Sequence, residues 1–124
     1  MRPLVLRGED PPDDTVVVIR GGEMENVFVR RSAERNHEEF GFFGISVFAA
    51  EDRTVEDLCA HLPQLARYRR VRLSTAGRLR ACGFALVATM ARPHVDVVLP
   101  DASDATLERL DGCFDPPIDN PGRR

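Results

Sequence analysis

The 124-residue chain contains no lysine, and all seventeen of its basic residues are arginine. The codon composition of a GC-rich genome accounts for this bias without any ligand, although the planar guanidinium also suits phosphate and carboxylate groups. Asp and Glu together number twenty, so the formal net charge is −3 at pH 7. This charge opposes broad, nonspecific attraction to nucleic acid. We therefore expect any nucleic-acid contact to be local.

The chain also lacks an apolar run approaching the ~20 residues that a membrane helix needs. Its opening, MRPLVLRGEDPP, becomes acidic too early for a signal peptide. We therefore expect a cytoplasmic protein that does not enter the membrane. With 43% hydrophobic and 30% charged residues, the chain has the composition of a globular protein that is large enough for one compact core.

Cysteine is scarce, and its spacing excludes the usual cysteine motifs. Cys59, Cys82 and Cys113 lie far apart, are odd in number and form no Cys-x-x-Cys pair. We predict reduced, mostly buried thiols, without a disulfide framework or a zinc knuckle. His37 and His61 have no metal-ligating residue four positions on, so we interpret them as helix-surface or packing residues. GGEMEN lacks the spacing of a phosphate-binding loop, and we predict neither a metal nor a cofactor.

The patterns that are present predict a single small α/β (α+β) domain with the order βαβαβ(α)ββα. The β-branched run TVVVIR, closed by two glycines, is the clearest strand. The predicted strands cover residues 15–20, 43–48, 70–75, 84–90 and 95–99. The predicted helices cover residues 26–40, a segment from Thr54 that Pro63 interrupts, a turn in AGRLRACG, and residues 103–113. We expect a mixed sheet of about five strands with the helices mainly on one face.

The two ends differ in composition from the middle of the chain. Residues 1–14 contain three prolines, a glycine and four acids around LVL, which is typical of a flexible acidic arm. Residues 115–124, DPPIDNPGRR, form a Pro-rich tail that a helix cannot enter. We therefore predict that residues 15–114 are the folded domain and that both ends are available to grip a partner.

Polar and apolar residues alternate in VRLST and in PHVDVVLP. On a strand, residues two apart share a face. Arg72 and Ser74 therefore lie on one face of their strand, and His94 and Asp96 lie on one face of theirs. If the helices cover the apolar sides, all four side chains share the uncovered face. The predicted site consists of Arg20, Arg72, Ser74, His94 and Asp96, and Ser46 of GISVF can join it.

This set of residues suits phosphate chemistry. A histidine transfers protons near neutral pH, a carboxylate can hold its tautomer, and arginines can stabilise developing phosphate charge. A metal-independent ribonuclease needs little more. His94 and Asp96 are, however, roughly 6.5–7 Å apart along an extended strand, so a direct hydrogen bond between them is not assured. The alternative interpretation is an ordinary solvated sheet face, and a metal site there lacks a third ligand.

Two resemblances follow from these segments. VVVIRGG is similar to the opening of ADP-ribosyltransferases, in which an arginine holds the dinucleotide phosphates and a serine strand and a glutamate follow. Ser46 or Ser74 fits the serine, but no glutamate falls in a matching place. The order VVVIRGG, GISVF, VRLSTAGRLR, RPHVDVVLP resembles a family of small uncharacterised bacterial proteins, which implies one autonomous domain and no known activity.

The absence of a specific catalytic motif and the two distinctive ends predict an interaction component of a protein complex or of a two-gene system of the toxin–antitoxin kind. A protein is then the expected partner. The alternative is a toxin-like enzyme, either a metal-independent RNase or an ADP-ribosyltransferase-like protein. It would act through Arg20, Arg72, Ser74 and His94.

Overall fold

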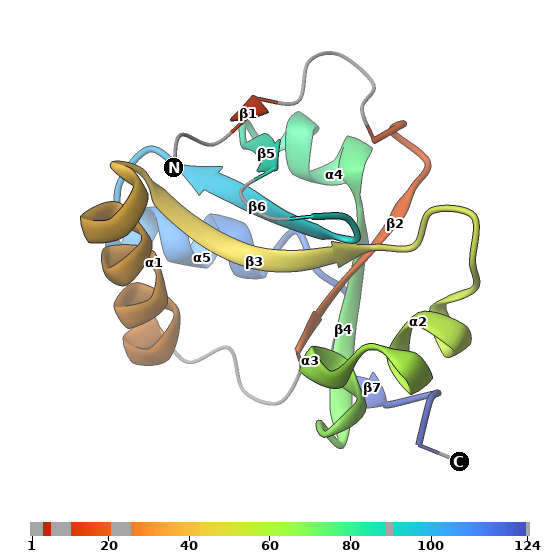
Figure 1. The fold of residues 1–124 in the computed structure, drawn as a ribbon. Coiled ribbons are helices and arrows are strands. Elements are labelled where there is room, and N and C mark those ends of the chain that lie inside the picture. The colour runs from red at the N-terminus through yellow and green to blue at the C-terminus, as the bar shows by residue number, and fades with distance from the viewer. Residues whose placement is uncertain (1–3, 6–10, 21–25, 89–90, 124) are drawn as a thin grey trace.

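The computed structural model describes residues 4–5, 11–20, 26–88 and 91–123 (Figure 1). The strands are β1 (Leu4–Val5), β2 (Val16–Arg20), β3 (Phe43–Ala49), β4 (Arg70–Thr75), β5 (Ala85–Ala88), β6 (His94–Leu99) and β7 (Ile118–Asp119). The helices are α1 (Asn26–Phe40), α2 (Val55–His61), α3 (Pro63–Ala66), α4 (Ala76–Ala81) and α5 (Asp104–Asp111). Within these ranges, no helix has the length and apolar character that crossing a membrane requires.

All seven strands belong to one sheet, in the order β1-β5-β6-β3-β2-β4-β7. The structure confirms a single α+β domain, and each of the five predicted strands is present. Residues 89–90 of the predicted strand 84–90 lie outside the described part of the chain. Two short strands, β1 and β7, extend the sheet at its edges. Every pairing is antiparallel, so the sheet is not mixed in strand direction.

The sheet bends where β2 meets β3. These strands share only the pairs Val17↔Ala49 and Val18↔Phe48, whereas β3 pairs with β6 along almost its whole length. Figure 1 shows β2 and β4 running across the direction of β3 and β6. The second half of the sheet, β2-β4-β7, therefore lies at an angle to the first and packs against different helices.

The two faces of the sheet have separate hydrophobic cores. On one face, called the α5 face, Val17, Val47 and Val97 pack against α1, α4 and α5. On the α2 face, Val18 and Phe48 pack against α2 and α3. Full burial of one such side chain contributes about 1.5–3 kcal/mol. Three of the five helices thus cover one face, and the other two cover part of the opposite face.

Short polar signals set the ends of the helices. The hydroxyls of Thr54, Thr75 and Ser103 each accept a hydrogen bond from the backbone N–H three residues on, and so cap α2, α4 and α5. Gly41 follows α1 at φ 84° and Gly83 follows α4 at φ 92°, which are left-handed conformations that glycine adopts without strain. The helix boundaries predicted at Gly41, Thr54 and Gly83 are confirmed. The cap at Thr75 was not predicted, and α5 ends at Asp111, two residues before the end of the predicted helix 103–113.

The C-terminal segment belongs to the folded domain, so the prediction of a separate Pro-rich tail over residues 115–124 is wrong. Ile118–Asp119 pairs with β4. The Asn120 side chain is buried, and its Nδ2 donates to the carbonyls of Leu65 (2.9 Å) and Tyr68 (2.8 Å). Gly122 lies so close to α2 that a Cβ there would approach the Ala60 nitrogen to 2.4 Å. The prolines exclude a helix, but they do not prevent an extended segment from packing.

Part of the predicted flexible arm, residues 1–14, is also anchored. Pro11 is buried, and the Asp13 carbonyl accepts a hydrogen bond of 2.9 Å from the Gly77 N–H. The Asp13 carboxylate pairs with Arg80 at 2.7 Å. Residues 11–14 therefore dock at the start of α4. Residues 1–3 and 6–10 of the arm lie outside the described part of the chain.

Candidate functional site

The structure divides the predicted polar face between the two sides of the sheet. Directly opposed residues of an antiparallel pair share a face. Arg72 and Ser74 oppose Ile19 and Val17, which places them on the α5 face. His94 and Asp96 oppose Phe48 and Ser46, which places them on the α2 face. The expectation that the four side chains share one uncovered face is therefore wrong.

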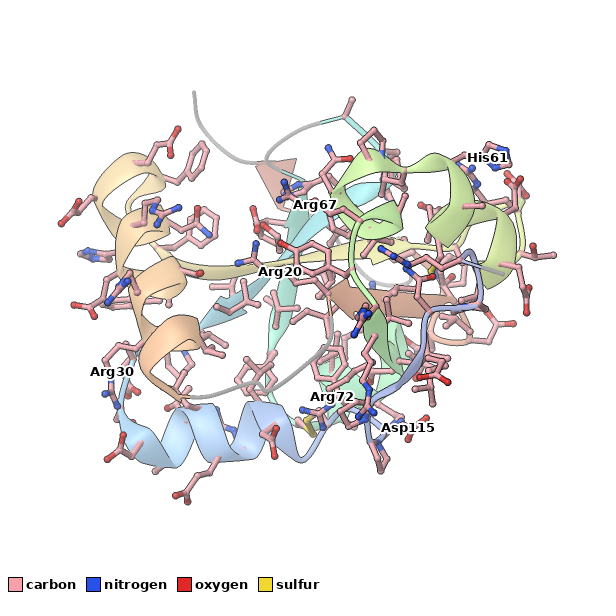
Figure 2. The ribbon with its side chains drawn as sticks, turned by 90° about the horizontal axis from the view of Figure 1, so that it is seen from below. Arg20, Arg30, His61, Arg67, Arg72 and Asp115 are labelled. Carbon is pink, nitrogen blue, oxygen red and sulfur yellow. A yellow bond between two sulfur atoms is a disulfide. The ribbon has the colours of Figure 1, made fainter. Side chains whose placement is uncertain are left out.

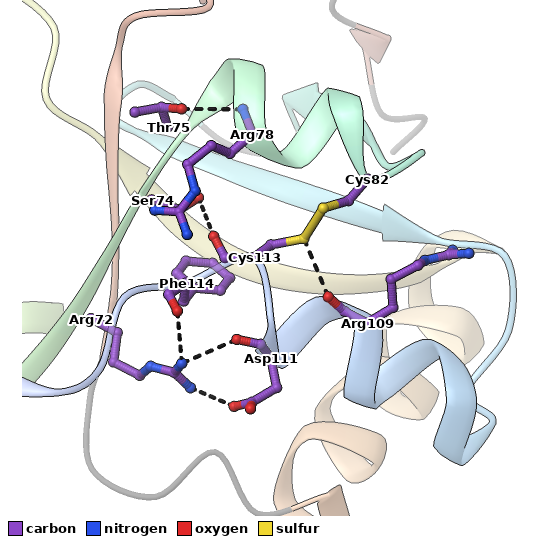
Figure 3. Close-up of a disulfide and its surroundings, with 9 residues drawn as sticks. All are labelled: Arg72, Ser74, Thr75, Arg78, Cys82, Arg109, Asp111, Cys113 and Phe114. Carbon is purple, nitrogen blue, oxygen red and sulfur yellow. Dashed lines mark hydrogen bonds and ion pairs between the residues drawn. A yellow bond between two sulfur atoms is a disulfide. The ribbon is translucent and has the colours of Figure 1, made fainter.

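Arg72 is a buried structural residue that holds the C-terminal segment (Figure 3). Its side chain is 8% exposed and its Nη1 donates to the Asp111 carboxylate at 2.6 Å. Its Nε donates to the Asp115 carbonyl at 2.8 Å, and its Nη2 donates to the carbonyls of Asp111 and Phe114 at 3.1 Å each. The guanidinium thus supplies donors to the end of α5, and little of it is available to a ligand.

Ser74 has a similar structural role one step along β4. Its Oγ donates to the Cys113 carbonyl at 2.5 Å, and the residue is 2% exposed. Cys113 forms a disulfide with Cys82, which joins the end of α5 to the end of α4 (Figure 3). The prediction of three reduced thiols is therefore wrong for two of them. Cys59 is free and buried, and burial, with a smaller effect from Glu56, raises its pKa to about 11.

Ser46, His94 and Asp96 form a polar cluster on the α2 face. The His94 Nε2 lies 3.0 Å from the Ser46 Oγ, and the Ser46 Oγ donates to the Asp96 Oδ1 at 3.3 Å. Asp96 is almost fully buried, with 1% of its surface exposed, whereas Ser46 is exposed. The Phe48 ring meets the His94 ring edge-on, with 5.5 Å between the centroids. β3 and β6 position all four residues.

The residue types of this cluster are those of a nucleophilic triad, but the geometry is different. In a triad the carboxylate binds the imidazole nitrogen that faces away from the serine, and so orients the ring. Here the Asp96 Oδ1 lies 4.0 Å from Nε2, the same His94 nitrogen that faces Ser46. The carboxylate therefore does not orient the ring for proton transfer. The absence of a direct hydrogen bond between His94 and Asp96 agrees with their spacing along the strand.

Arg20, the remaining predicted site residue, belongs to a different cluster (Figure 2). Its Nη1 donates to the Tyr68 hydroxyl at 3.4 Å, and its Nη2 donates to the Ser32 Oγ at 3.5 Å. The Arg67 Nη2 donates to the same Tyr68 oxygen at 3.3 Å. Partial burial alone would raise the pKa of the Tyr68 phenol. The hydrogen bonds and positive charges of Arg20 and, to a smaller extent, of Arg67 outweigh this effect and lower the pKa from 10.0.

A groove lies between α2, β4 and β7. Its volume is about 910 Å³. It is lined by Val55, Glu56, Arg69, Arg70, Leu73, Ile118, Asp119, Asn120, Pro121 and Arg123. Among the large hydrophobic residues of the described segments, Ile118 is the exposed one, with 42% of its surface accessible. The five C-terminal residues of this lining belong to the end of the chain that was expected to grip a partner. The other five, Val55, Glu56, Arg69, Arg70 and Leu73, were not expected to contribute to a site.

No group of three His, Cys, Asp or Glu side chains suited to a metal ion occurs in the described part of the chain. Comparisons with models of protein families, with curated proteins and with solved structures find no match to this chain. The resemblances noted in the segment order therefore remain predictions.

Proposed function

We propose that the protein is an interaction component, and that it binds an acidic segment of a protein partner in the groove between α2, β4 and β7. One observation carries this proposal. Ile118, an exposed apolar side chain, lies in that groove with Arg69, Arg70 and Arg123. An apolar anchor surrounded by arginines is the composition that protein interfaces favour.

The charges in the groove indicate the chemistry of the partner. Three arginines line it against two carboxylates, those of Glu56 and Asp119. Arg70 and Asp119 are the nearest opposite charges in the groove, with 4.0 Å between the Arg70 Nε and the Asp119 Oδ1. Both side chains are exposed, so this ion pair contributes little to stability. Acidic side chains of a partner would complement the remaining positive charge, which favours both specificity and rapid association.

The groove has one wall that depends on the C-terminal segment. Asn120 holds this segment to the backbone around α3, and Gly122 packs directly on α2. A rigid wall lowers the entropy that is lost when a partner binds. The C-terminal residues thus serve the proposed interaction as part of a preformed surface, which differs from the flexible handle expected from their composition.

The enzyme alternative receives less support from the geometry. Arg72 and Ser74 are engaged within the fold, on the face opposite to His94. Arg20 and His94 lie on strands separated by β3, which places their backbones at least roughly 10 Å apart. Growth arrest on expression in a bacterial host, relieved by His94→Ala, would favour a toxin-like enzyme over the interaction component.

A cytoplasmic location also remains a proposal. The Cys82–Cys113 disulfide is more typical of an oxidising compartment, because cytosolic thiols are kept reduced. Mass analysis of the protein isolated under thiol-blocking conditions would measure the state of the pair. A fully blocked pair would favour the cytoplasm.

The groove is tested with a phage-displayed library of random peptides selected on the purified protein. We expect selected peptides to combine acidic residues with one apolar residue. Ile118→Asp should lower their affinity at least about tenfold, since truncating an interface anchor typically costs more than 1 kcal/mol. Arg70→Glu should lower it as well. Arg35→Glu makes the same charge change on α1, away from the groove, and serves as the matched control.

Two results would contradict the proposed groove. One is that no acidic class of peptide is selected. The other is that Ile118→Asp and Arg35→Glu bind the selected peptides equally well. Circular dichroism and thermal unfolding of each variant show whether a loss of binding reflects the groove or the fold.

A further inference from the structure

A second cluster, beside the groove but outside its lining, has the donors of an anion site. We propose that Arg20, Arg67 and Tyr68, with Ser32 beside them, bind the dianionic phosphate of a phosphate monoester. The four side chains come from separate elements. Arg20 ends β2, Arg67 caps the C-terminus of α3, Tyr68 follows it, and Ser32 lies on α1.

These side chains converge on a single point. Both guanidinium groups donate to the Tyr68 hydroxyl oxygen, from Arg20 at 3.4 Å and from Arg67 at 3.3 Å. The Arg67 guanidinium also lies 5.2 Å from the centroid of the Tyr68 ring. Figure 2 shows Arg20 and Arg67 approaching each other from different elements. The fold therefore places two positive charges around one neutral oxygen.

The two arginines differ from most others in how their charge is balanced. Arg53, Arg72 and Arg80, for example, each bind a carboxylate oxygen at 2.6–2.8 Å. Within the described segments, Arg20 and Arg67 make no ion pair, and their side-chain acceptors are neutral hydroxyls at 3.3–3.5 Å. A guanidinium has five N–H donors, so most of the donors in this cluster remain available to a ligand.

The titration of Tyr68 supports this description of the charge. Its pKa is lowered from 10.0 although burial alone raises it, because the hydrogen bonds and positive charge of Arg20 and Arg67 stabilise the phenolate. The same positive potential would stabilise an anion placed beside the phenol. The phenol and Ser32 hydroxyls can each donate a further hydrogen bond to it.

A phosphate monoester fits this donor set better than a carboxylate does. Its three terminal oxygens carry up to two negative charges, which matches two guanidinium groups that approach from different directions. A single carboxylate has two oxygens in one plane and one charge, so it pairs with one guanidinium. The site is independent of the proposed peptide groove, although Arg123, which lines the groove, also donates to the Arg67 carbonyl at 2.9 Å.

The composition of the chain provides a site-specific probe. Tyr68 is the only tyrosine and there is no tryptophan, so tyrosine fluorescence reports on this cluster alone. The experiment titrates the full chain with inorganic phosphate at constant ionic strength, with sodium chloride as the blank. We expect a saturable change with a dissociation constant of about 1 mM or below. We also expect phosphate to raise the pKa of Tyr68, because a bound dianion opposes the positive charge.

Variants separate a specific site from general attraction by charge. Arg20→Gln and Arg67→Gln should each weaken phosphate binding at least about tenfold, because each removes a charged hydrogen-bond donor. Arg109→Gln removes the same charge from α5, outside the cluster, and should leave the affinity within about twofold. Both Arg20 and Arg67 are exposed, so their variants are expected to fold, which circular dichroism verifies.

Two organic monoesters then identify the source of the phosphate. Tighter binding of AMP than of O-phosphoserine indicates a nucleotide, and the reverse order indicates a phosphorylated protein. For either ligand the affinity should fall as the pH drops through about 6, where the monoester loses its second charge.

Three results would overturn the proposal. The first is a fluorescence change that does not saturate, and the second is an equal loss of binding in the Arg20 and Arg109 variants. The third is a change that chloride reproduces. Because none of these measurements uses a peptide, failure of the phosphate site is distinct from failure of the proposed groove.

Discussion

Replacing Arg72 with alanine should destabilise the protein by about 3–4 kcal/mol. The substitution removes four hydrogen bonds, three of them to the carbonyls of Asp111, Phe114 and Asp115. The hydrogen bond to the Phe114 carbonyl is buried and the two to the Asp111 and Asp115 carbonyls are partly buried, and each carbonyl left without its donor costs about 1 kcal/mol. The Asp111 carboxylate is 53% exposed and regains water, so loss of the ion pair adds a smaller amount. The sum is well above the usual effect of a surface substitution.

The free energy of unfolding is measured by urea titration of the wild type and the variant under the same conditions. Arg78→Ala is the matched control, because Arg78 pairs with Asp115 through exposed side chains, 41% and 59% exposed. It should cost less than about 1 kcal/mol. Arg72→Lys keeps the charge but loses the planar fork, and should fall between the two. If Arg72→Ala lies within about 0.5 kcal/mol of the wild type, the argument that Arg72 holds the C-terminal segment is refuted.

Three other outcomes are expected. Reduction of the Cys82–Cys113 disulfide, which spans 31 residues of sequence, should lower the free energy of unfolding by about 3–4 kcal/mol, because the reduced unfolded chain gains entropy. Urea titration with and without reductant measures this change, and a change under about 1 kcal/mol would contradict the prediction. Asn120→Ala should lower the free energy of unfolding by about 2 kcal/mol, because the Leu65 and Tyr68 carbonyls lose their donor. Deletion of residues 118–124 should lower it further, and equal stability of the truncated chain would show that the segment does not support the domain. Hydrogen bonds from the Ser103 and Thr106 hydroxyls and from the Ser103 N–H lower the pKa of Asp101 to about 2. The stability that Asp101 contributes is therefore fully present above the unfolded pKa of about 3.9 and is lost as the pH falls through about 2. Asp101→Asn should lower stability at neutral pH, and a difference from the wild type that persists in acid would contradict this cause.

Local signals account for the success in predicting the elements. The β-branched run of β2 and the hydroxyl caps at Thr54 and Ser103 act over a few residues, so a short stretch of sequence contains all the information they need. The glycines at the ends of α1 and α4 act in the same way. The seven-stranded order could not be inferred, because it depends on pairings between strands that are distant along the chain.

The candidate site shows the limit of reasoning from alternation. Alternation in β4 correctly places Arg72 and Ser74 on one side of the strand. It does not indicate which side is covered, and in this protein both faces of β4 are packed, one against α2 and α3 and the other against the end of α5. A buried arginine and a solvated one have the same sequence pattern. Only the carbonyls around Arg72 distinguish them.

The sequence by itself determined the single α+β domain, the position of most helices and strands, and the charge that disfavours nonspecific nucleic-acid binding. The tertiary structure alone decided which polar residues meet. It brought Cys82 to Cys113, folded the Pro-rich segment onto β4 and α2, and separated Arg72 from His94. It also gathered Arg20, Arg67 and Tyr68 at one point. The physical reason is that hydrogen bonds and ion pairs act over a few ångströms of space. The residues that make them are tens of residues apart along the chain, and the pattern of the residues between them does not indicate that they will meet.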